Sequence, residues 1–107
     1  MPDHVHLLVE GRDATSHMCS FAHLAKQRTA YVYTKATGRR LWQPSYWDHV
    51  LRDEESTWDV ARYICDNPVR KGLVERWDLY EFTGSGVMTR EEFRREMASR
   101  PATRWQP

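Results

Sequence analysis

Residues 4–9 have the sequence His4-Val5-His6-Leu7-Leu8-Val9, and Gly11 follows shortly after them. The apolar and β-branched residues of this segment predict a β-strand that ends near the glycine. Successive side chains of a strand point to opposite faces, so His4 and His6 would share one face. Two imidazoles on one face can bind a single metal ion. A pair with this spacing also occurs by chance, and an incidental pair remains the alternative interpretation.

The following residues predict two long helices and a second strand. Apolar residues repeat at helical spacing over 15–36, and Gly38 provides a stop signal. We expect a strand at 46–52 and a helix at 54–67, which ends because a residue that precedes proline avoids helical angles. A third helix is expected from Thr89 to about Ala98, where Thr89 and Glu92 have the spacing of a capping box.

Tyr63 and Asn67 lie four residues apart in the second predicted helix and therefore share one of its faces. In one interpretation Tyr63 is a boundary residue with a solvated hydroxyl, and Asn67 caps the helix. In the other, Tyr63 is a nucleophile and the Asn67 amide oxygen joins the two histidines around a metal ion. The spacing by itself does not distinguish them.

The charges are unevenly distributed, although the net charge is only +1. The stretch from Ala14 to Trp47 contains no Asp or Glu, and its basic residues alternate with aromatic ones. Surfaces that bind single-stranded nucleic acid combine these two residue types. A helix with aromatic residues towards the core and lysines towards water would have the same composition. The basic members are Lys26, Arg28, Lys35, Arg39 and Arg40, and the aromatic members are Phe21, Tyr31, Tyr33, Trp42, Tyr46 and Trp47.

Two further features exclude other classes of protein. The first residues lack the basic and apolar parts of a signal peptide, and no apolar stretch is long enough to cross a bilayer. We therefore expect a cytoplasmic protein without a membrane partner. Cys19 and Cys65 form no CxxC pair and are expected to be reduced thiols in the core.

Several motifs together resemble one family. They occur in the order and approximate spacing of the REP-associated tyrosine transposases, a branch of the single-tyrosine HUH transposases, and they extend from Met1 to about Glu81. The blocks are His4-Val5-His6-Leu7-Leu8-Val9, Gly38-Arg39-Arg40-Leu41-Trp42-Gln43, His49-Val50-Leu51-Arg52-Asp53, Ala61-Arg62-Tyr63-Ile64 and Asn67-Pro68-Val69-Arg70-Lys71-Gly72-Leu73-Val74.

The resemblance implies an α+β fold, a ferredoxin-like or RRM-like antiparallel sheet with helices on one face. Residues 1–85 would form the transposase domain, and 86–107 a charged helix and tail. The family has a strand and a helix ahead of the histidine strand, so we expect this chain to be truncated at its N-terminus. A mis-set start codon, a decayed gene and a homodimer that restores the missing elements are three open explanations.

The resemblance also implies a site. Tyr63 would be the nucleophile, and His4, His6 and Asn67 would bind a divalent ion, Mg²⁺ or Mn²⁺. The substrate would be single-stranded or hairpin DNA, which becomes linked to the tyrosine through a 5′-phosphate. The candidates for contact with DNA are Arg39, Arg40, Trp42, Arg52 and Arg70.

Two other functions remain open at this point. A truncated remnant could bind hairpin DNA through the basic and aromatic stretch without cleaving it. A plain metalloprotein or small structural domain, in which the histidine pair is incidental, is the third class.

Overall fold

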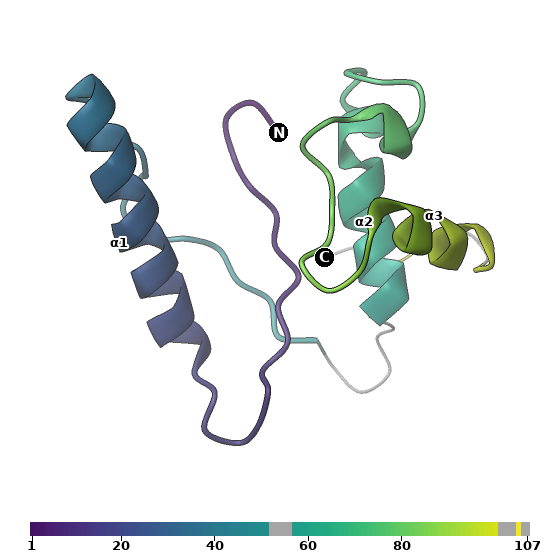
Figure 1. Ribbon diagram of the computed structural model, residues 1–107, viewed down its shortest axis with the longest axis horizontal. Coiled ribbons are helices and arrows are strands. Elements are labelled where there is room, and N and C mark those ends of the chain that lie inside the picture. Colours follow the sequence, from purple (N-terminus) through teal and green to yellow (C-terminus); the bar gives the residue numbers. More distant parts are fainter. Residues whose placement is uncertain (52–56, 101–104, 106–107) are drawn as a thin grey trace. The chain divides into compact units, whose positions relative to one another are not determined.

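The computed structural model describes residues 1–51, 57–100 and 105. Its elements are helices, and the described residues contain no strand (Figure 1). They are α1 (Met18–Thr37), α2 (Thr57–Arg70), a short 3-10 helix η1 (Trp77–Leu79) and α3 (Arg90–Ala98).

The chain divides into two compact units. One unit consists of Val9–Asp48 and contains α1. The other combines Met1–Leu8 with His49–Pro107 and contains α2, η1 and α3. This division places the histidine segment in the same unit as Tyr63.

Helix α1 confirms the helix that was predicted over residues 15–36. Its first turn is capped by the His17 ring, which accepts a hydrogen bond from the Ser20 N–H at 3.2 Å. Gly38 ends the helix with a φ of +72°, a left-handed conformation that glycine adopts without steric cost. The following loop is tied back to the helix, because the Trp42 indole N–H donates to the Thr29 hydroxyl at 2.8 Å.

The unit that contains α2 has its own hydrophobic core. Cys65, Phe93 and Met97 are buried together, so α3 packs against α2. The Phe93 ring stands perpendicular to Trp77, with 5.4 Å between ring centres, which attaches η1 to the same core. Trp58, Ala61, Trp77 and Met88 are partly buried around it.

Helix α2 does not end before Pro68, so that prediction was wrong. Pro68 lies inside the helix and is buried, and the helix continues to Arg70. The missing proline N–H removes one helical hydrogen bond, but the next turn is closed by other bonds. The Leu73 N–H donates to the Pro68 carbonyl at 2.9 Å and the Gly72 N–H to the Val69 carbonyl at 3.0 Å, a Schellman motif with Gly72 at a φ of +75°.

Helix α3 confirms the predicted capping box. The Glu92 N–H donates to the Thr89 hydroxyl at 3.1 Å, and the Thr89 N–H donates to the Glu92 carboxylate at 3.4 Å. The helix ends at Ala98, as expected.

The predicted α+β fold, with a ferredoxin-like or RRM-like antiparallel sheet, is wrong for the described residues, which are helical or irregular. Residues 4–9 and 46–51 form no strand. The physical reason is that a strand exists only through hydrogen bonds to a partner and through burial of one face. Here Val5 and Leu7 remain 58% and 64% exposed, so the apolar pattern of this segment is not buried against a partner strand.

None of the helices in the described ranges combines the length and the apolar character that a membrane crossing needs.

Candidate active site

Tyr63 and Arg70 contact each other at the predicted site. Both belong to α2, and seven residues, about two turns, separate them. The Arg70 guanidinium carbon lies 3.9 Å from the centre of the Tyr63 ring. One of its nitrogens, Nη2, also donates to the Tyr63 main-chain carbonyl at 2.8 Å. Tyr63 is half-buried and Arg70 is exposed, so the pair lies at the surface of its unit.

A second aromatic residue approaches the same tyrosine. The Trp105 ring meets Tyr63 edge to face, with 5.4 Å between ring centres and 78° between ring planes. Trp105 also lies 6.0 Å from the His49 ring. This contact was not predicted, since the sequence around Trp105 has no helical or strand periodicity. Its aromatic character was the one available signal.

The structure brings His4 and His6 together. Their ring centres are 4.9 Å apart and the rings are nearly perpendicular, at 84°. The Asp3 carboxylate lies 2.7 Å from His4 Nδ1, and this hydrogen bond, with the charge of His4, lowers the pKa of Asp3. A carboxylate on one ring nitrogen fixes the imidazole orientation and leaves the other nitrogen for a ligand.

His6 is influenced by groups from two segments. Partial desolvation of its ring lowers its pKa, and the charges of His4, the N-terminus and Arg70 act in the same direction. The contribution from Arg70 places the histidine segment within electrostatic reach of the Tyr63–Arg70 pair. A lowered pKa favours the neutral imidazole, which is the form that binds metals.

Asn67 differs from the other predicted ligands because it is buried, with 7% exposure. Its Nδ2 atom has no hydrogen-bond partner among the described residues. Buried amide groups are nearly always paired, so this atom marks a place where a further polar group fits. Rotation of the amide would place its oxygen there instead. No hydrogen bond or ring contact in the described ranges joins Asn67 to the histidine pair.

The donors fit a divalent ion by type. Two imidazoles and one amide oxygen suit Mn²⁺, and they suit Mg²⁺ when further oxygen ligands complete the shell. The described part of the chain has no group of three or more His, Cys, Asp or Glu side chains that could hold a metal ion. An ion at this position would therefore depend on Asn67 or on the substrate for its remaining ligands.

The predicted DNA contacts are distributed over both units. Arg39 and Arg40 are exposed in the unit of α1, and Trp42 is half-buried there with its indole N–H bonded to Thr29. Arg70 lies in the unit of α2, next to Tyr63. Arg52 lies outside the described residues.

The basic residues of the Val9–Asp48 unit differ in how available they are to bind a ligand, because some of them already make contacts within the unit. Lys26 donates to the main-chain carbonyls of Gln43 at 3.1 Å and Ser45 at 2.9 Å, so its ammonium group holds the loop. Lys35 contacts the Tyr31 hydroxyl at 3.1 Å. The exposed side chains of Arg39 and Arg40 are better placed for a ligand than Lys26.

Comparison with known proteins gives two relatives. A REP-associated tyrosine transposase from Escherichia coli strain K12 is 31% identical over 87 residues, which cover 78% of this chain and 48% of that protein. A protein from Haemophilus influenzae, which carries the same name provisionally, is 29% identical over 86 residues, 70% of this chain and 49% of that protein. This chain thus spans about half the length of the curated relatives it matches. No family model matches it, and no solved structure does.

Both relatives belong to the class of transposases. The chain is similar to these REP-associated tyrosine transposases over most of its own length, which confirms the resemblance predicted from the motif blocks.

Proposed function

We propose that this chain is a transposase-type endonuclease and strand transferase for single-stranded DNA, with Tyr63 as its nucleophile. The observation that carries the proposal is the Tyr63–Arg70 pair at the surface of the unit that also contains the paired rings of His4 and His6. The similarity to REP-associated tyrosine transposases supports the same reaction class.

In the proposed step, the Tyr63 hydroxyl oxygen attacks the phosphorus of a phosphodiester. A phosphorus–oxygen bond to Tyr63 forms, and the bond between phosphorus and the 3′ oxygen breaks. The phenol loses its proton to solvent or to a nearby base, and the departing 3′ oxygen gains one to become a hydroxyl. The product is a 5′-phosphotyrosine, and the free 3′-hydroxyl can reverse the step because the phosphodiester energy is retained.

His4, His6 and Asn67 would hold a divalent ion, Mg²⁺ or Mn²⁺. Such an ion polarises the phosphate and stabilises the charge that develops on its oxygens. The chain's own contribution is to orient the His4 ring through Asp3 and to favour the neutral form of the His6 ring, whose pKa is lowered by partial desolvation. Arg39, Arg40 and Trp42 would bind the DNA strand, Arg52 remains a sequence-based candidate for the same role, and the cytoplasm is the proposed compartment.

A covalent-adduct assay tests the proposal. The folded 107-residue chain is incubated with a library of single-stranded DNA hairpins in the presence of Mn²⁺ or Mg²⁺ and analysed on a denaturing gel. We expect a protein–DNA band that disappears in Tyr63→Phe and persists in Tyr80→Phe, a matched loss of one hydroxyl in the same unit. A band that survives in Tyr63→Phe would reject Tyr63 as the nucleophile.

A hairpin-binding module without cleavage is the second candidate. The observation that favours it is that the acid-free stretch, residues 14–47, lies within the compact unit Val9–Asp48, whereas Tyr63 belongs to the other unit. Its signature would be tight binding of hairpin DNA by both wild type and Tyr63→Phe, with no covalent band from either protein. Loss of DNA affinity in Arg39→Ala plus Arg40→Ala would locate the binding surface.

A further inference from the structure

We propose that Arg70 is the positioning residue of Tyr63, and that its main role is to hold the phenol ring rather than to bind a DNA phosphate. The inference deepens the proposed function and rests on it. Two contacts support it. The guanidinium lies 3.9 Å from the ring centre, and Nη2 donates to the Tyr63 carbonyl at 2.8 Å.

The two contacts together constrain both partners. The hydrogen bond anchors the guanidinium to the main chain of the residue whose side chain it covers. The planar group then restricts the positions that the ring can adopt, because it lies against the ring at van der Waals distance. Only an arginine combines a fork of donors with a flat surface that stacks on an aromatic ring.

The charge of Arg70 is held beside the Tyr63 ring, 3.9 Å from its centre. A phosphodiester that approaches Tyr63 would meet a positive charge already fixed in place. Preorganised charge of this kind requires no rearrangement when the bond forms.

The test uses Arg70→Lys and Arg70→Ala, with Lys71→Ala as the matched control. Lys71 is the exposed neighbour and carries the same charge, but among the described residues it is Arg70, not Lys71, that lies over the Tyr63 ring. The 107-residue chain is labelled with ¹³C-tyrosine, and the Tyr63 ring signal is assigned as the one that Tyr63→Phe removes. We expect the chemical shift of this signal to change in both Arg70 variants, although lysine keeps the charge. It should remain unchanged in Lys71→Ala. An unchanged Tyr63 signal in Arg70→Ala would overturn the proposal.

Kinetics distinguish positioning from phosphate binding. We expect both Arg70 variants to slow single-turnover adduct formation at saturating DNA by about tenfold to a hundredfold, with little change in DNA affinity. Equal losses in rate and affinity, or full rescue by lysine, would assign Arg70 to the phosphate instead. If the wild-type chain forms no covalent adduct with DNA, the proposed function is rejected. The contribution of Arg70 to the rate of that reaction is then rejected as well. The ring signals would still decide whether Arg70 holds Tyr63.

Discussion

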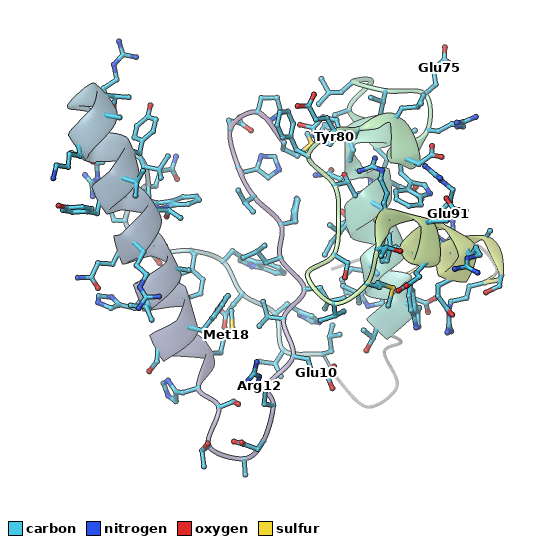
Figure 2. The ribbon with its side chains drawn as sticks, viewed as in Figure 1. Glu10, Arg12, Met18, Glu75, Tyr80 and Glu91 are labelled. Atoms are coloured by element: carbon cyan, nitrogen blue, oxygen red, sulfur yellow. The ribbon has the colours of Figure 1, made fainter. Side chains whose placement is uncertain are left out.

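The guanidinium of Arg90 donates to the main-chain carbonyl of Asp78 at 2.7 Å, so the first residue of α3 holds the chain twelve residues earlier. The same group donates to the carbonyls of Tyr80 at 3.0 Å and Thr83 at 2.8 Å. Figure 2 labels Tyr80 in this segment, between η1 and α3. One partly buried cation thus replaces the hydrogen bonds that a strand or helix would supply to three carbonyls.

Arg90→Ala should therefore lower the free energy of unfolding by about 2 kcal/mol, since hydrogen bonds to a charged group are lost and carbonyls are left unpaired. Urea unfolding monitored by circular dichroism measures this change. Amide hydrogen exchange should also speed up at Thr83, whose N–H bonds to the Tyr80 carbonyl. Arg95→Ala, an exposed arginine on the same helix, should change neither quantity. Equal effects of the two substitutions would contradict the role of Arg90.

Asp78 makes the same region sensitive to acid. Its burial acts to raise the pKa of the carboxyl, but Arg76 and Arg94, each 3.1 Å away, offset that effect and hold the pKa below its ordinary value. A carboxyl with a depressed folded pKa adds stability that is complete above its unfolded pKa. This stability is lost as the pH falls through the folded value.

Asp78→Asn should consequently destabilise the protein at pH 7, and the difference from wild type should shrink below the ordinary carboxyl pKa of about 3.9. The measurement is the urea midpoint of both proteins at pH 7 and pH 3. Glu75→Gln removes an exposed carboxylate nearby (Figure 2) and should show no such pH dependence. A difference that stays constant between the two pH values would exclude the ion pairs as its cause.

Local sequence signals correctly predicted those helix ends that are determined by hydrogen bonds between residues close in the sequence. Gly38 ends α1 and the Thr89–Glu92 box begins α3, where each cap satisfies main-chain groups within a few residues. The end of α2 could not be predicted in this way. Proline disfavours a helical conformation of the residue before it, but burial of Pro68 and the hydrogen bonds around Gly72 outweigh that preference.

The strand predictions failed because β-propensity depends on a partner. Residues 4–9 have the composition of a strand, and the pairing that would make them one is absent from the described residues. The adjacency of the His4 and His6 rings was expected from strand geometry, yet it occurs without a strand. The contacts of Tyr63 with Arg70 and Trp105 come from tertiary packing and side-chain conformation, which periodicity does not encode.

The two cysteines should differ strongly in reactivity. Both were expected in the core, but Cys19 is exposed and only Cys65 is buried. Burial, followed by the charge of Asp66, raises the pKa of Cys65 to about 12, so it carries almost no thiolate at pH 8. A disulfide reagent such as DTNB should therefore modify one thiol rapidly at pH 8, and the second only after unfolding in urea. Cys19→Ser should abolish the fast phase, and two fast thiols in the folded protein would contradict the packing of α2 on α3.

Metal binding provides the last prediction, which concerns the histidine pair independently of cleavage. Two imidazoles with ring centres 4.9 Å apart can share one ion, and Asp3 orients the first of them. We expect wild type to bind Mn²⁺, as measured by calorimetry, and to unfold at a higher temperature when the ion is present. His4→Ala plus His6→Ala should weaken the affinity by about tenfold or more. His23→Ala, which removes an exposed histidine from α1, should leave the affinity unchanged.

If the double variant binds Mn²⁺ as tightly as wild type, the pair is incidental. The proposed chemistry would then have to rely on Tyr63 and Arg70 without a metal ion at these histidines.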